Sequence, residues 1–151
     1  MTNVLTARLE PGLFDKGQLE RLVVASGGNL RDLFAMAGNA ADEALVQEQA
    51  VIGKKQVDRV IGEMRVTYER RLGQNPFDED AITYDQKRDR LKCIYDRQAQ
   101  ADVPDSVLYA LLRARAVQEF NGEQWFDIHP LVVDVLIDHN VIEHGESGGT
   151  L

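Results

Sequence analysis

The chain has 151 residues, of which 44% are hydrophobic and 28% charged, proportions typical of a folded protein and not of an intrinsically disordered one. Its 17 Lys and Arg residues against 25 Asp and Glu residues give a net charge of −8, which opposes nonspecific binding to nucleic acid or anionic lipid. Because there is a single cysteine, no signal-peptide pattern and no apolar run near the ~20 residues of a membrane span, we expect a cytoplasmic protein with no membrane contact.

The first part of the chain carries three helical patterns. Asp15 can cap a first helix, and Gly27 or Gly28 can end it in the left-handed conformation. Asn29 is a suitable N-cap for a second helix that should run to about Gln49. Apolar residues at spacings of three and four predict its inward face: Leu30, Leu33, Phe34, Ala37, Ala41, Ala44 and Leu45. A third helix, ending near residue 73, has its own inward face: Val57, Val60, Ile61, Met64 and Tyr68.

The stretch "GQNPFDEDA" that follows combines glycine, proline and acidic residues without periodicity, which is typical of a linker. It predicts a helical subdomain over residues 1–75 and a second domain over 80–143. The glycine-rich residues 144–151 are expected to be a disordered tail.

The second domain shows a different order of elements. A helix is expected from about Asp85 to Gln98, and a second one begins at Pro104 or Asp105. Two alternating runs around Asn121-Gly122 then predict a β-hairpin with a tight turn, and "LVVDVLIDH" predicts a last helix. Helix, helix, hairpin, helix is the element order of a winged helix. The predicted fold class is therefore mainly α, with a small helical bundle followed by a winged-helix domain with one β-hairpin.

Two stretches of the sequence resemble a known family. "SGGNLRDLFAMAGNAADEA" is similar to the sensor-2 region of AAA+ and STAND-type P-loop ATPases, and residues 12–72 resemble the small helical lid of those enzymes. "LLRARAVQEFNGEQWFDIHPLV" resembles the winged-helix domain that follows the lid in bacterial ATPases of this group. The resemblance implies a lid and a winged-helix domain over nearly the whole chain.

The resemblance also implies a nucleotide-sensing role for Arg31, presented by Gly27, Gly28 and Asn29. The chemistry is suitable in its own right, because an arginine in the first turn of a helix lies at the positive end of the helix dipole and can bind phosphate oxygens. Without the resemblance, Arg31 is a surface arginine paired with Asp32 or Glu20. Asp32 itself is expected to complement the helix dipole.

The sequence contains no GxxxxGK[ST] motif, and "VIGKKQ" lacks both the preceding glycine loop and the following Ser or Thr. We therefore expect no catalytic activity from this chain alone. ATP and Mg²⁺ would be bound only together with a P-loop domain, placed upstream in the same polypeptide or supplied by another one.

Four residues are candidates for contact with DNA or a protein partner: Arg113, Arg115, Gln118 and Gln124. Residues 54–97 hold eleven basic and nine acidic residues, a local balance of +2, so the rest of the chain carries −10. Acidic residues alternate with the basic ones there, a pattern typical of a salt-bridged helix face. We therefore favour a protein partner for the winged helix and keep a stand-alone DNA-binding protein as the alternative. Self-association through an apolar face is also possible.

Other conspicuous residues have structural explanations. His129, before Pro130, is expected to hydrogen-bond to backbone at the end of a strand. Trp125 and Ile128 are expected in the core, and Cys93 is expected to pack as a small apolar residue.

Overall fold

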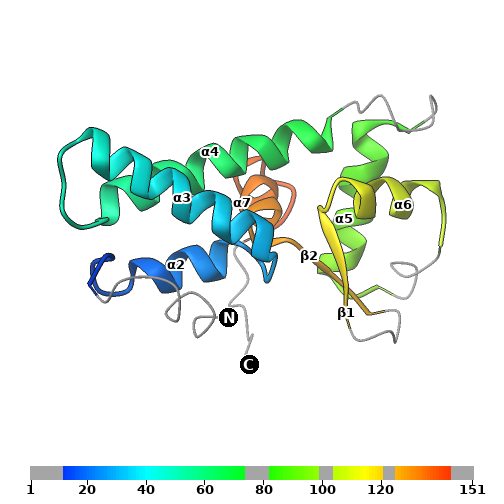
Figure 1. Ribbon diagram of the computed structural model, residues 1–151. Helices are drawn as coiled ribbons and strands as arrows, with labels where there is room; N and C mark the ends of the chain where they lie inside the picture. Colours follow the sequence, from blue (N-terminus) through cyan, green and yellow to red (C-terminus); the bar gives the residue numbers. More distant parts are fainter. Residues whose placement is uncertain (1–11, 74–81, 99–103, 121–124, 144–151) are drawn as a thin grey trace. The chain divides into compact units, whose positions relative to one another are not determined.

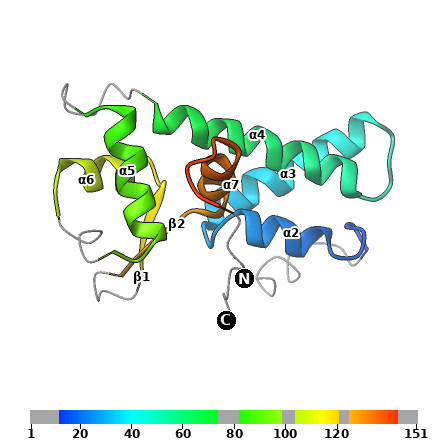
Figure 2. The same ribbon diagram turned by 180° about the vertical axis from the view of Figure 1, so that it is seen from behind.

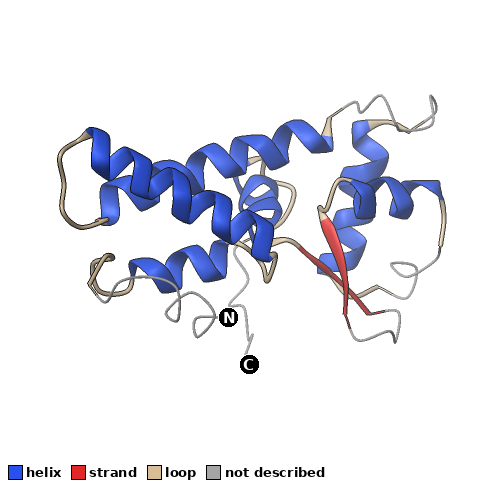
Figure 3. Ribbon diagram, in the orientation of Figure 1, coloured by secondary structure: helices blue, strands red, loops and turns tan. Residues whose placement is uncertain are grey.

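The computed structural model describes residues 12–73, 82–98, 104–120 and 125–143. These residues form helices and one antiparallel pair of strands, which confirms a mainly α fold with one β-hairpin (Figures 1 and 3). The chain divides into two compact units, Met1–Thr67 and Tyr68–Leu151. The linker predicted after residue 73 and the tail predicted after residue 143 lie outside the described residues, and the domain limits drawn from them remain a prediction.

The first unit begins with a short parallel bridge between Phe14 and Ile52, followed by helix α2 (Gln18–Ala25). The N-cap of α2 is Gly17, with φ 81° and no side-chain cap, so the predicted capping role of Asp15 is wrong. Asp15 instead donates its backbone N–H to the carbonyl of Ile52, at 3.0 Å. This pairing with a residue far along the chain holds Asp15 too far ahead of the helix to cap it.

Helix α3 (Leu30–Val46) is the second helix of this unit and packs against α2. Its buried side chains are Asp32, Leu33, Met36, Ala37, Ala40 and Ala44. Leu30, Phe34 and Leu45 are exposed, which contradicts their predicted place on the inward face. The predicted face was too broad, because the seven apolar positions extend around more of the helix than the neighbouring helices cover.

Helix α4 (Lys54–Leu72) follows α3 along the chain after a loop (Figures 1 and 2). Side-chain hydrogen bonds join it to α3. Gln56 is buried and donates its amide to the side-chain oxygen of Gln47 at 2.8 Å, while Arg59 donates to Glu43 at 2.7 Å. Of the predicted inward residues of α4, Val57, Val60 and Tyr68 are buried; Ile61 and Met64 are half-buried.

The second unit contains the end of α4 and the remaining elements. In chain order these are α5 (Tyr84–Tyr95), α6 (Ser106–Arg113), β1 (Val117–Phe120), β2 (Trp125–Ile128) and α7 (Pro130–Asp138). The order helix, helix, strand, strand, helix is the predicted one. Helix α5 packs against both α6 and β2, so the strand pair and α6 share one supporting helix.

The two strands pair in a register that sets Val117 opposite Ile128 and Phe120 opposite Trp125. The backbone N–H of His129 donates to the carbonyl of Ala116 at 2.9 Å and extends the pairing by one step. Phe126 and Ile128, two residues apart, are both buried, so this face of β2 points into the core. The predicted turn at residues 121–122 and the side chain of Trp125 lie outside the described part of the structure.

A buried aromatic pair lies beside the strands. The rings of Tyr68 and His129 are stacked, with centroids 4.1 Å apart and planes inclined by 18°. The Nδ1 atom of His129 accepts the backbone N–H of Leu131 at 3.3 Å. This bond to backbone at the strand end confirms the structural role predicted for His129.

Candidate functional site

The break between α2 and α3 is made by two consecutive glycines in the left-handed conformation. Gly27 has φ 55° and Gly28 has φ 86°, so both contribute to the predicted left-handed stop. Such angles are unfavourable for residues that carry a Cβ atom, and two in succession favour glycine at both positions. The backbone N–H of Asn29 then donates to the carbonyl of Ser26 at 2.9 Å, which closes the turn and lets α3 begin at the next residue.

Asn29 caps α3, as predicted. Its Oδ1 accepts the backbone N–H groups of Arg31 and Asp32, at 3.1 and 3.5 Å, and its Nδ2 donates to Oδ2 of Asp32 at 2.9 Å. Asp32 is buried, so its carboxylate fixes the cap from inside the unit. Because the cap already uses these first-turn N–H groups, an anion at this helix end would have to be held mainly by a side chain.

Arg31 is that side chain. It is exposed and, within the described residues, makes no side-chain hydrogen bond or ion pair. The alternative pairing with Asp32 or Glu20 is therefore not formed, because Asp32 is turned inward toward Asn29. None of the guanidinium's donors is used by a described residue, so the group can hold an anion such as a phosphate group by two parallel hydrogen bonds.

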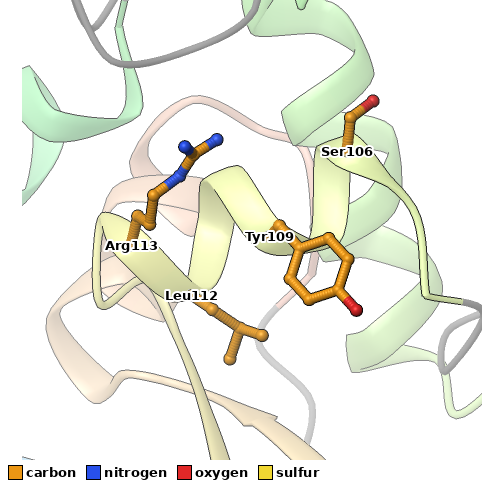
Figure 4. A pocket seen from close by; sticks show the side chains of 4 residues that line it. All are labelled: Ser106, Tyr109, Leu112 and Arg113. Atoms are coloured by element: carbon orange, nitrogen blue, oxygen red, sulfur yellow. The ribbon is translucent and has the colours of Figure 1, made fainter.

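A second surface lies on α6. Asp105 caps this helix by accepting the N–H of Leu108 at 2.8 Å, and the buried side consists of Leu108, Ala110 and Leu111. The other side borders a surface hollow of about 550 Å³, lined by Ser106, Tyr109, Leu112 and Arg113 (Figure 4). Tyr109, on this side, is 56% exposed.

The predicted contact residues of the second unit are not all part of this hollow. Arg113 is exposed and lines it, and its guanidinium extends away from the Tyr109 ring (Figure 4). Arg115 is half-buried with φ 59° just after α6, and Gln118 is half-buried in β1 opposite Asp127. Gln124 lies outside the described residues.

Tyr109 and Leu112 were not among the predicted contact residues. A signal for them exists in the sequence, since they lie three residues apart and are offset from the buried Leu108 and Leu111 by one position. The spacing separates a buried side of α6 from an open one. It does not show that the open side forms a hollow.

The basic residues on and after α5 are engaged within the unit. Lys87 is only 1% exposed and its Nζ donates to the carbonyls of Leu72 and Gly73, at 3.2 and 2.8 Å. The hydrogen bond to Asp89 raises the pKa of Arg88 above its ordinary value. The remaining pairs are Arg88 with Asp85, Arg90 with Asp105, Lys92 with Asp96, and Arg97 with Asp127. These pairs confirm the predicted salt-bridged character of this region.

Cys93, Tyr84 and His139 are further reactive side chains among the described residues of the second unit. Cys93 is half-buried and unpaired with any other cysteine. The Tyr84 hydroxyl lies 3.1 Å from Nδ1 of His139, whose Nε2 lies 3.2 Å from Glu69, and burial raises the pKa of Tyr84. In the described ranges no three His, Cys, Asp or Glu side chains are grouped as metal ligands.

Comparisons of the chain with protein-family models, with curated proteins and with solved structures found no match. Over the residues that the structure describes, no helix has both the length and the apolar character needed to cross a membrane. The geometry described above leaves two candidate sites: the N-terminus of α3 with Arg31, and the open side of α6.

Proposed function

We propose that this chain is the C-terminal regulatory part of a P-loop ATPase, in which Arg31 senses the bound nucleotide. The observation that carries the proposal is the environment of Arg31. It is an exposed arginine without a side-chain partner among the described residues, and it lies in the first turn of a helix that directly follows the double-glycine break. An arginine so placed can bind a terminal phosphate and lose that contact when the phosphate leaves.

The nucleotide itself would be held elsewhere. Because the sequence has no GxxxxGK[ST] motif, ATP and Mg²⁺ would be bound by a P-loop domain in the same polypeptide or in another chain. Catalysis would belong to that domain, and this chain would supply the sensing arginine. We place the assembly in the cytoplasm, in keeping with the single unpaired Cys93.

The response to nucleotide would pass along the helices. Bonds of Gln56 to Gln47 and of Arg59 to Glu43 link α4 to α3, so a shift of α3 on phosphate binding would be transmitted to α4. Helix α4 begins in the first unit and ends in the second. The second unit, which we interpret as a winged helix from its element order, would then report the nucleotide state to a protein partner.

The open side of α6 is the surface that we assign to this partner. Tyr109 and Leu112 offer apolar contact area and Arg113 offers a positive charge, a combination common at the centres of protein interfaces. The DNA-binding alternative has less support, because the basic residues of α5 are already bonded within the unit.

The test is to isolate the native assembly through an affinity tag on this chain and to measure its ATP turnover with Arg31→Ala, Arg31→Lys and the control Arg70→Ala. Arg70 is also an exposed arginine near a helix end. We expect Arg31→Ala to change turnover by at least ~10-fold, the worth of one hydrogen bond to a charged group, and Arg70→Ala to have little effect.

Arg31→Lys keeps the charge but not the two parallel donors, so its turnover should fall between those of the wild type and Arg31→Ala. Two results would refute the proposal. One is that no P-loop protein is found in the tagged assembly, either fused to this chain or bound to it. The other is that Arg31→Ala and Arg70→Ala have the same turnover as the wild type.

A further inference from the structure

One side of α3 is apolar and uncovered along its whole length. Leu30, Phe34 and Leu45 are 43%, 42% and 76% exposed, Gly38 is exposed and Ala41 is half-buried. These residues follow one another at steps of four, four, three and four, so they form a continuous stripe on the helix. No other helix of the first unit covers this stripe. The residues of α3 that face α2 and α4 are its buried residues, and the stripe residues are not among them.

We infer that this stripe binds the same stripe of a second copy of the chain, with the two α3 helices antiparallel. The stripe is suited to such a pairing because it is symmetric about the midpoint between Ala37 and Gly38. Leu30 then lies opposite Leu45 of the second copy, and Phe34 lies opposite Ala41, so that a large side chain meets a small one. The same contacts occur twice, as a two-fold axis requires.

Gly38 lies next to the centre of this arrangement. A Cβ atom built on Gly38 would meet no other atom within 4 Å, so the space above the helix is open there. The missing side chain lets a second helix approach closely at the crossing point, where a larger residue would hold the backbones apart. The apolar ends of the stripe can then both make contact.

Charge complementarity supports a second copy as the occupant. Arg31 and Asp42 are both exposed, lie on the same edge of the stripe and, within the described residues, have no side-chain partner. In the antiparallel pair, the positions of Arg31 in one copy and Asp42 in the other are two residues apart along the helix axis. At 1.5 Å per residue this separation is about 3 Å. Each dimer therefore gains two ion pairs between copies.

The expected dimer is weak. Helix α3 has 17 residues and is about 25 Å long, so one helix pair buries less area than a standard protein interface. A dissociation constant of about 10 to 100 μM is reasonable for a contact of this kind. A dimer of this strength would form at high local concentration, as in an assembly.

The test is sedimentation equilibrium of the whole 151-residue chain from ~1 to ~500 μM, a range chosen to bracket the expected dissociation constant. Arg31→Asp and Asp42→Arg should each weaken the dimer by ~10-fold or more, because like charges then face each other. The double variant Arg31→Asp/Asp42→Arg should restore the dimer to within ~3-fold of the wild type, because the pairs are re-formed with reversed sign. All substituted positions are exposed, so folding is expected to be unaffected.

Leu45→Glu tests the apolar part of the contact and should abolish the dimer, whereas Tyr109→Ala, in the second unit, should not change it. A monomeric wild-type chain at every concentration would overturn the inference. The inference would also be overturned if the charge reversals left the dissociation constant of the dimer unchanged, or if Tyr109→Ala weakened the dimer. A stripe that is protected from hydrogen exchange only when a P-loop protein is added would overturn it as well, since that protein would then be its occupant.

The ion pair with Asp42 and the proposed phosphate contact use the same Arg31 guanidinium, so the dimer is the state without bound nucleotide, and its test is separate from that of the proposed function. Sedimentation is measured without nucleotide, so failure of the dimer leaves the ATPase proposal standing, and failure of the Arg31→Ala turnover test leaves the dimer standing.

Discussion

Helices α3 and α5 use their basic side chains in opposite ways. Helix α5 carries four basic residues, and each is bonded to a neighbour within the second unit. Helix α3 carries a single one, Arg31, which has no side-chain partner within the described residues. The difference shows that the number of basic residues in a segment is a poor measure of the charge that is available to a ligand.

Both helices nevertheless begin in well-ordered caps. Asn29 caps α3, while Thr83 and Gln86 form a capping box at the start of α5. The contrast between the helices therefore lies in the partners of their side chains.

The first prediction compares Lys87→Met with Arg31→Met. The buried Nζ of Lys87 bonds two carbonyls at the C-terminal end of α4, so Lys87→Met should lower the free energy of unfolding by about 2 to 4 kcal/mol. Arg31→Met changes an exposed side chain that has no partner among the described residues, so it should alter the free energy of unfolding by less than ~0.5 kcal/mol. Urea unfolding monitored by circular dichroism measures both. Equal effects of the two substitutions would remove the contrast.

The second prediction compares the two caps. Thr83→Ala should lower the free energy of unfolding by about 1 kcal/mol. Asn29→Ala should cost more, about 2 kcal/mol, because it also removes a hydrogen bond to the buried carboxylate of Asp32.

Thermal unfolding of the two variants, with Asn29→Ser as control, gives the comparison. Serine keeps an oxygen that can accept the first-turn N–H groups, so Asn29→Ser should recover part of the loss. A smaller loss for Asn29→Ala than for Thr83→Ala would mean that the inward bond to Asp32 contributes little.

The third prediction concerns binding to duplex DNA, which we expect to be weak. Because the basic residues of α5 are engaged, any binding at low salt should be weak, with a slope of log K against log salt no larger than about 2 in magnitude. Arg88→Ala should leave it unchanged, whereas Arg113→Ala should weaken it. Fluorescence anisotropy with a labelled duplex measures this, and a slope of about 5 or more would show that the cations of α5 are available to phosphates.

The features that the sequence predicted correctly depend on local chemistry. The glycine break and the Asn29 cap each follow from the behaviour of a residue within one or two turns of its own position. The start of α6 was expected at Pro104 or Asp105, and the structure has Asp105 as the N-cap. The salt-bridged face of α5 follows in part from charges three or four positions apart, such as Asp85 with Arg88.

The features that the sequence did not predict depend on residues far along the chain. Asp15 fails as a cap because Ile52 binds its backbone, and Lys87 is buried because the carbonyls of Leu72 and Gly73 receive its ammonium group. The exposure of Phe34 depends on which side of α3 the neighbouring helices cover. Spacing identifies apolar positions, but only packing decides which of them are covered.

Photo-crosslinking with an ATP analogue that carries an aryl azide on its γ-phosphate tests whether Arg31 contacts the nucleotide. The analogue is bound to the native assembly, irradiated and digested with trypsin, which cleaves after Arg21, Arg31 and Lys54. If Arg31 contacts the terminal phosphate, the label should be found in residues 22–31 or 32–54, and unmodified ATP should prevent it. A label confined to the P-loop domain, or found only in the second unit of this chain, would contradict the sensing role of Arg31.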